Sequence, residues 1–180
     1  MILKDIRLKK SGFTLIDLMI TLGIVAILLA MAIPDIKSWL SNYRLNIAAR
    51  DIALSMQLAK MKAISINNYV SISFINVNIG GTTYDYALYV DQDKDLEYDD
   101  GEQAIKNVKL SDYKGVSFDT SVRGDGVTFA NNCVAFDSMG LPKNKTGGFG
   151  AGSIYLENTR NKGKKVVVSS VGRISIVDYK

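Results

Sequence analysis

The chain has 180 residues, of which 47% are hydrophobic and 22% are charged, so it has the composition of a folded protein with room for one domain and an appendage. It contains no histidine and one cysteine, which excludes an intrachain disulfide, the usual zinc ligand sets and the Ser-His-Asp or Cys-His catalytic groups. The stretch GGFGAGS at 147–153 lacks the lysine of a phosphate-binding P-loop. We therefore expect a protein that is not an enzyme.

Residues 1–12 form a basic leader. Lys4, Arg7, Lys9 and Lys10 outnumber Asp5, so this segment carries most of the net charge of +4 and the rest of the chain is close to neutral. The positive-inside rule places such a leader in the cytoplasm and sends the following chain across the membrane. The basic balance is consequently poor evidence for a nucleic-acid partner.

An apolar run follows from Phe13 to Ile33, and Asp17 is its one charged residue. Its length matches the roughly 20 residues that an α-helix needs to cross a bilayer. In a secretory signal the small cleavage-site residue follows the apolar core, whereas Gly12 precedes it here. Cleavage after Gly12 would remove the leader and keep the membrane helix. The alternative is a plain signal anchor with a stray aspartate.

The stretch GFTLIDLMITLGIVAILLAMAIP, residues 12–34, resembles the class III leader and first helix of type IV prepilins and type II secretion pseudopilins. The resemblance implies that prepilin peptidase cuts after Gly12 and methylates the new amino terminus at Phe13. It assigns Asp17 the assembly role that a glutamate has in most relatives, and it matches Pro34 to a proline that commonly kinks the pilin helix.

Elementary electrostatics supports a role for the aspartate. After cleavage, the free amine of Phe13 would lie four residues before Asp17, on the same helix face and at the positive end of the helix dipole. In a fibre the same carboxylate would neutralise the amine of a neighbouring subunit. The small residues Gly23, Ala26 and Ala30 would let helices approach closely, although such residues are also ordinary in lipid-facing helices.

Beyond Pro34 the pattern becomes amphipathic, and we expect one helix over 13–68 that leaves the membrane at about residue 33. Its apolar positions recur in steps of three and four, with Asp51 as the one polar interruption. These positions are Ile36, Leu40, Tyr43, Ile47, Leu54, Leu58 and Met61. We expect this half of the helix to pack on the following domain, and Asn67-Asn68 to end it.

Residues 69–180 contain short β-rich runs separated by glycine-bearing turns, which predicts antiparallel strands. The runs are YVSISFINV, YDYALYVD, AIKNVKL, GVSFDT, CVAFDSMG, GSIYLEN, KKVVVSS and RISIVDY. The predicted fold class is α+β: a long N-terminal helix, half transmembrane and half amphipathic, packed on a small antiparallel two-sheet domain. The segments YVDQDKDLEYDDGEQAI, FDSMGLP and VVVSSVGRISI resemble the GspH/FimT group of minor pseudopilins and minor pilins.

The acidic segment DQDKDLEYDDGE, residues 91–102, places carboxylates with the spacing of a calcium-binding loop. The candidate ligands are Asp91, Asp93, Asp95, Glu97 (through its backbone carbonyl), Asp99 and Glu102. The glycine that an EF-hand needs at its sixth position is Leu96, and no helices are expected on either side. The alternative is a solvated acidic loop that docks on another subunit.

Cations dominate the chain after Gly140, and they suggest a phosphate-binding surface. The candidates for DNA contact are Lys162, Lys164, Lys165 and Arg173. Some FimT relatives take up DNA through a Gly-Arg-X-Arg stretch, and here Gly172-Arg173-Ile174-Ser175 lacks the second arginine. The alternative is a solvated hairpin tip, or one that pairs with an acidic loop such as 91–102 of the next subunit.

The resemblance implies a minor pilin or pseudopilin, held first in the bacterial inner membrane with a cytoplasmic N-terminus and a periplasmic domain. Its partners would be prepilin peptidase and the helices of other pilins, in a type IV pilus or a type II secretion pseudopilus. Two alternatives are a DNA-uptake receptor on a pilus and a simple anchored periplasmic domain, which would not be processed at Gly12.

Overall fold

A computed structural model describes residues 12–180, with the side chains of 32–35 excepted. The chain consists of two units, Met1–Ser38 and Trp39–Lys180. The leader residues 1–11 lie outside the described residues.

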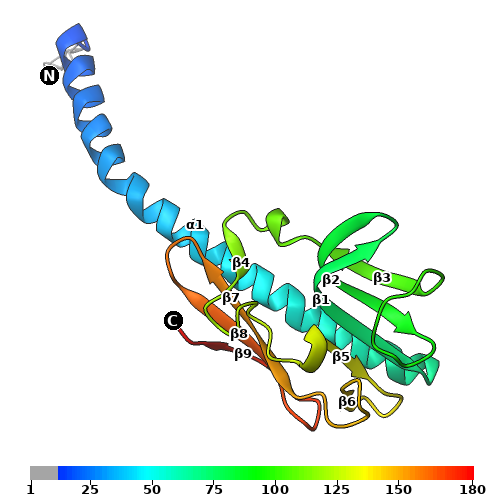
Figure 1. The fold of residues 1–180 in the computed structure, drawn as a ribbon. Helices are drawn as coiled ribbons and strands as arrows, with labels where there is room; N and C mark the ends of the chain where they lie inside the picture. The colour runs from blue at the N-terminus through cyan, green and yellow to red at the C-terminus, as the bar shows by residue number, and fades with distance from the viewer. Residues whose placement is uncertain (1–11) are drawn as a thin grey trace, which may run out of the picture. The chain divides into compact units, whose positions relative to one another are not determined.

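One long helix and nine strands make up the described chain (Figure 1). They are α1 (Leu15–Ile66), β1 (Tyr69–Ile79), β2 (Thr82–Asp91), β3 (Gln103–Val108), β4 (Val116–Phe118), β5 (Cys133–Phe136), β6 (Pro142–Lys143), β7 (Gly152–Asn158), β8 (Gly163–Val168) and β9 (Ile174–Asp178), with short 3-10 turns η1 (Leu110–Asp112) and η2 (Ala130–Asn132). The predicted fold class is thereby confirmed: a long N-terminal helix on an antiparallel β domain. Eight of these strands overlap the eight predicted runs, one strand to each run, and the ninth, β6, was not predicted.

The strands form two antiparallel sheets. The first has the order β3-β2-β1-β5-β6 and the second the order β4-β7-β8-β9. The hairpin of β1 and β2 is the longest pairing, in register from Tyr69↔Asp91 to Ile79↔Thr82, with a bulge between Phe74 and Val77. Because antiparallel strands alternate their side chains, each sheet presents one apolar face to a shared core.

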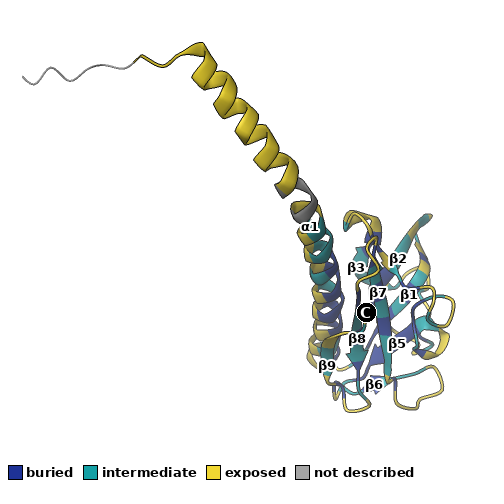
Figure 2. Cartoon of the chain, turned by 90° about the vertical axis from the view of Figure 1, so that its left-hand side faces the viewer, coloured by how far each residue is buried: buried dark blue, intermediate teal, exposed yellow. Residues whose placement is uncertain are grey.

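The core of the second unit lies between α1 and the two sheets (Figure 2). The face of α1 that enters it is built mainly from small side chains: Leu45, Ala48, Ala49, Ile52, Ala53, Met56, Ala59 and Ala63. Opposite them lie Ile72, Leu88 and Phe136 from the first sheet and Ile154, Leu156 and Val166 from the second. Alanine lets the helix backbone approach the sheets closely, so large residues are left to the strands.

The face of α1 that packs on the domain is not the one that the apolar spacing predicted. Of the seven predicted positions, Ile36, Tyr43, Ile47, Leu54, Leu58 and Met61 are exposed and Leu40 is only partly buried. The helix is apolar on two opposite faces with the same period, and the residues with the larger side chains occupy the outer one. The prediction was wrong because it followed the larger apolar side chains, whereas the alanines at the same spacing form the face that packs on the sheets.

Candidate assembly surface

The first turn of α1 is closed by a reciprocal cap between Thr14 and Asp17. The carboxylate of Asp17 accepts from the backbone N–H of Thr14 at 3.1 Å and from its hydroxyl at 2.6 Å. The Thr14 hydroxyl oxygen accepts in turn from the backbone N–H of Asp17 at 3.2 Å. This is a capping box, in which an aspartate replaces the usual glutamate. Thr14 belongs to the leader motif, but its capping role was not predicted from the sequence, although the T-x-x-D spacing was visible.

The cap gives Asp17 a role within its own helix. In the chain as it stands, its carboxylate is bonded to Thr14 and not to Phe13, whose nitrogen is part of a peptide bond. Gly12 and Phe13 are both exposed, and they precede the helix. A prepilin cut would therefore fall in a segment without regular structure, directly before the cap.

In the first unit, the large side chains of the apolar run are exposed on every face of the helix. Between Phe13 and Met31 every described residue is exposed. α1 is the one helix in the described part of the chain that is long and apolar enough to cross a membrane, and its span lies near the N-terminus. Pro34 lies within α1, which continues through it.

An exposed apolar stripe continues along α1 in the second unit. We define the outer stripe as Trp39, Tyr43, Ile47, Leu54, Leu58 and Met61. Leu54 exposes 60% and Met61 62% of its surface. The rings of Trp39 and Tyr43 stack with centroids 5.3 Å apart. Large apolar side chains that lie exposed in a row on one helix face are a candidate interaction surface.

Asp51, the polar interruption, anchors the helix to the first sheet. Its carboxylate accepts from the hydroxyl of Tyr86 at 2.6 Å and from the ammonium of Lys106 at 2.7 Å. Burial works to raise the pKa of Asp51, but the bonds from Lys106 and Tyr86 outweigh it and the net pKa is lowered. Burial and the neighbouring Asp51 carboxylate raise the pKa of Tyr86, so its hydroxyl stays a donor. Asp51 thus bonds α1 to β2 through Tyr86 and to β3 through Lys106.

The structure brings only part of the predicted calcium set together. Ligand oxygens of Asp91, Asp93 and Asp95 lie within 4.8 Å of one another. The side-chain carboxylate of Glu97 is paired with Lys145, whereas the ligand predicted from this residue is its backbone carbonyl. Glu102 accepts from the backbone N–H groups of Gln92 at 2.9 Å and Asp99 at 3.2 Å.

Asp91 also has a structural role in this loop. It is fully buried and accepts from the Ser71 hydroxyl at 2.6 Å, and from the backbone N–H groups of Lys94 at 2.7 Å and Leu96 at 3.1 Å. Burial raises its pKa despite these bonds. Burial also raises the pKa of Glu102. These contacts bond the loop to β1 and to its own backbone, and calcium binding stays a prediction.

The four residues predicted to contact DNA do not share one surface. Lys162 precedes β8, whereas Arg173 follows it, at the opposite end of the strand. Lys164 is paired with Asp178 of β9. Lys165, on the other face of β8, lies over the ring of Tyr155 at 6.0 Å. A continuous track for a phosphate backbone is therefore not assembled from these four side chains.

Comparison with known proteins agrees with this architecture. The family model for type II transport protein GspH matches residues 48–172, which is more than half of the chain. The chain belongs to the GspH family. The prokaryotic N-terminal methylation motif matches residues 7–33, a range that includes Gly12, Phe13 and Asp17. The chain is therefore a pilin or pseudopilin subunit.

One relative extends the likeness over nearly the whole GspH chain. The pilin-like protein PilA1 of Thermus thermophilus is 28% identical over 165 residues, which cover 91% of this chain and 96% of that protein. No solved structure gives a significant match. The family and the methylation motif indicate a membrane-anchored pilin of the kind that the leader and helix predicted, and the relative is itself named as pilin-like.

Proposed function

We propose that this GspH protein is a minor pilin or pseudopilin that is processed at Gly12 and then takes part in the initiation or assembly of a filament. Prepilin peptidase cuts after Gly12 and methylates Phe13. Until then the chain is anchored in the bacterial inner membrane, with its basic leader in the cytoplasm and Trp39–Lys180 in the periplasm. It is later extracted into a type IV pilus or a type II secretion pseudopilus, and it does no catalysis.

The observation that carries this proposal is the second apolar face of α1. The inner face is already satisfied by the sheets, whereas the outer stripe is left open to water. Burying apolar surface is favourable by about 25 cal/mol per Å². A helix packed against one domain has no need of a second large-residue face, but a helix that also packs against other helices does.

Processing would change the partners of Asp17. The new amine at Phe13 is a cation, and a carboxylate that now serves only as a helix cap would gain an ionic partner in its own chain or in the next subunit. Placing both charges in an apolar fibre core is costly unless they are paired. Asp17 would thereby set the axial position of each subunit.

The test places a charge on the outer stripe. Leu54→Asp puts a carboxylate on a side chain that is 60% exposed, so the second unit should fold normally while incorporation into filaments is lost. Val171→Asp is the matched control, because Val171 is 70% exposed but lies on the β8–β9 turn. The measurement is recovery of each tagged variant with sheared filaments from its own host.

Mass spectrometry of the same samples reads the N-terminus. An N-methylated Phe13 is expected in all variants, since cleavage precedes assembly. Normal incorporation of Leu54→Asp would contradict the role of the outer stripe, and an intact Met1 in the wild-type chain would contradict processing. The accompanying proteins distinguish a pilus from a secretion pseudopilus.

A DNA-uptake role has less support, because Lys162, Lys164, Lys165 and Arg173 do not lie on one surface. It predicts that Lys164→Glu/Lys165→Glu abolishes DNA binding by the purified full chain.

A further inference from the structure

One end of the second unit gathers cations from three segments that are distant in sequence. We define the basic rim as Arg44, Lys114, Arg160 and Lys162. Arg44 donates from Nη1 to the carbonyl of Lys114 at 3.4 Å, which joins α1 to the loop before β4. The backbone N–H of Thr159 donates to the carbonyl of Gly115 at 3.2 Å, which joins the β7–β8 turn to the same loop.

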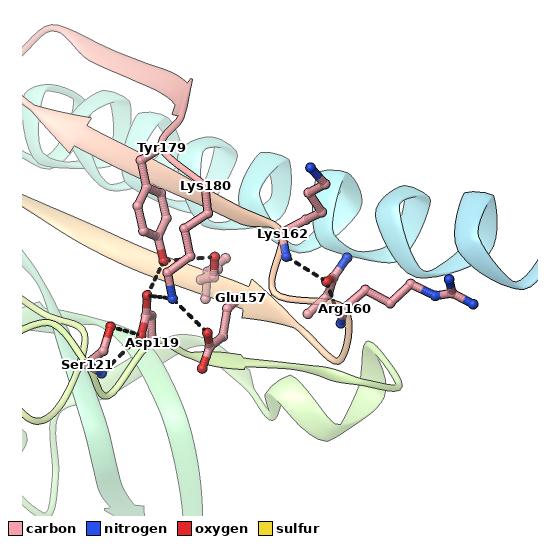
Figure 3. A network of polar contacts seen from close by, with 9 residues as sticks. Asp119, Ser121, Glu157, Arg160, Lys162, Tyr179 and Lys180 are labelled. Carbon is pink, nitrogen blue, oxygen red and sulfur yellow. Dashed lines mark hydrogen bonds and ion pairs between the residues drawn. The ribbon is translucent and has the colours of Figure 1, made fainter.

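The turn that carries two of these cations is held in a fixed shape. Asn158 is buried, and its side-chain oxygen accepts from the backbone N–H groups of Arg160 at 2.9 Å and Lys162 at 3.1 Å. Its side-chain nitrogen donates to Asn42 of α1 at 2.9 Å. Figure 3 shows the side chain of Arg160 extending along α1 towards the earlier turns of the helix. The turn thus presents its cations at a defined place beside Asn42.

Two carboxylates near the rim, Glu157 and Asp178, are already paired with lysines outside it. Glu157 accepts from the ammonium of Lys180 at 3.0 Å, and Asp178 is paired with Lys164. Asp112, exposed in η1, is the remaining carboxylate close to Lys114 in sequence. Setting aside the side chains of 32–35, no carboxylate of residues 12–180 forms an ion pair with a rim cation. The rim therefore keeps a positive charge for an external anion.

A polar cavity lies beside the turn. It has a volume of about 280 Å³ and is lined by Asn42 and Asn46 of α1, by Lys162, by Lys164 of β8 and by Asp178 of β9, among others. Amide and ammonium donors are the groups that bind phosphate oxygens.

An exposed aromatic pair stands next to the rim on α1. Trp39, the chain's only tryptophan, stacks on Tyr43, and the two expose 64% and 49% of their surfaces. Trp39 is the sixth residue after Ile33, the end of the apolar run, and six residues of helix rise by about 9 Å. Tryptophan and tyrosine are enriched at the level of lipid headgroups, where their rings contact acyl chains and their polar atoms contact water.

We propose that the basic rim, with Trp39 and Tyr43, binds the anionic phospholipid headgroups of the membrane that holds the apolar run. The inference rests on the proposed membrane anchoring and adds a second contact to it, between the folded unit and the bilayer surface. Headgroup binding would keep the waiting subunit close to the membrane. Because the attraction acts over about 10 Å at 0.1 M salt, it would be weakened as ionic strength rises.

The test uses the full chain in nanodiscs of phosphatidylcholine, with or without phosphatidylglycerol. Hydrogen–deuterium exchange is measured for the amides of 158–162. We expect exchange to be several-fold slower with phosphatidylglycerol, and the difference to disappear in high salt and in Arg160→Glu/Lys162→Glu. In Lys94→Glu/Arg173→Glu, which reverses the same charge on exposed residues of other turns, the difference should remain.

Exchange of the buried amides of β1 shows, in each variant, that the domain is folded. Equal exchange of 158–162 in both lipids would overturn the inference, as would a lipid effect that survives the rim reversal in a folded variant. Protection by added duplex DNA and not by phosphatidylglycerol would overturn it in favour of nucleic acid. Incorporation into nanodiscs reports the anchoring separately, so a chain that inserts but shows no lipid-dependent protection refutes the headgroup contact alone.

Discussion

Asp119 is the most thoroughly bonded carboxylate of the second unit. It is fully buried at the end of β4 and accepts from the hydroxyl of Ser121 at 2.5 Å, the hydroxyl of Tyr179 at 2.6 Å and the ammonium of Lys180 at 2.5 Å (Figure 3). Burial works to raise the pKa of Asp119, but the bonds from Lys180, Ser121 and Tyr179 outweigh it and hold the pKa well below its usual range. The last two residues of the chain are fixed to the domain by this group.

The depressed pKa predicts how stability depends on pH. A carboxyl whose pKa is lower in the folded chain stabilises it above the unfolded value of about 3.9, and this contribution is lost as the pH falls towards the folded value. We expect Asp119→Asn to lower the free energy of unfolding at pH 7 by roughly 1–3 kcal/mol, and to reduce the loss of stability between about pH 4 and pH 2. Urea titrations of both proteins across this range check it; parallel pH profiles would contradict it.

At the scale of elements, the two apolar faces of α1 have different surroundings: one packs on the β domain and the other is exposed. The domain packs on the face with Ala48, Ala59 and Ala63, whose small side chains allow close packing, and leaves Leu54 and Met61 outside.

One strand of the first sheet, β6, could not be predicted from the sequence. β6 consists of Pro142 and Lys143 alone, paired with β5 by Phe136↔Pro142 and Ala135↔Lys143. Two residues are too few to show the alternating pattern of a strand, and proline is unfavourable in strands. β6 is therefore recognised only by its pairing with β5.

The two faces predict opposite responses to substitution. Ala59 has no exposed surface, so Ala59→Leu should overpack the core and lower the free energy of unfolding by about 1–3 kcal/mol. Leu54→Ala, at a position that is 60% exposed, should change it by less than about 0.5 kcal/mol. Urea unfolding of the full chain in detergent checks both, and a larger loss for Leu54→Ala than for Ala59→Leu would mean that the faces are reversed.

At the scale of the second unit, charge is divided between separate regions. The basic rim lies beside Asn42, near the start of the part of α1 that belongs to the second unit. The acidic loop 91–102 begins at Asp91, the last residue of β2, which pairs with Tyr69 just after the helix ends. We propose a separate partner for each region: lipid headgroups for the rim, and calcium or another subunit for the loop. Calcium binding to the loop would be detected as an increase in the stability of the whole unit.

Calcium should stabilise the whole unit if the carboxylates of Asp91, Asp93 and Asp95 bind it. A ligand that binds only the folded chain adds about 1.4 kcal/mol when it is present at roughly ten times its Kd. We expect calcium to raise the Tm relative to EDTA in the wild-type chain and to have no effect on Asp93→Asn/Asp95→Asn. Magnesium is the control for charge alone, and equal effects of the two cations would refute a specific site.

The sequence by itself determined the long helix, eight of the nine described strands and the apolar run of membrane-crossing length. Gly12, Phe13 and Asp17 stand at the head of an apolar run of membrane-crossing length, and the change from helical to alternating spacing near Asn67 and Asn68 marks the start of the β domain. These are local signals, because the spacing of apolar residues and a short motif can be recognised without knowing which distant residues pack against them.

Only the tertiary structure decided which face of α1 is inside and which charges stand together. Both helix faces repeat with the same period, and the choice depends on the space between two sheets and on the bonds of Asp51 to Tyr86 and Lys106. Likewise, Arg44 and the turn of Arg160 and Lys162 contact the same loop at Lys114 and Gly115 only because the chain is folded, while Lys164 is paired with Asp178. Contacts between residues far apart in sequence have no local period, and they appear only when the chain is folded.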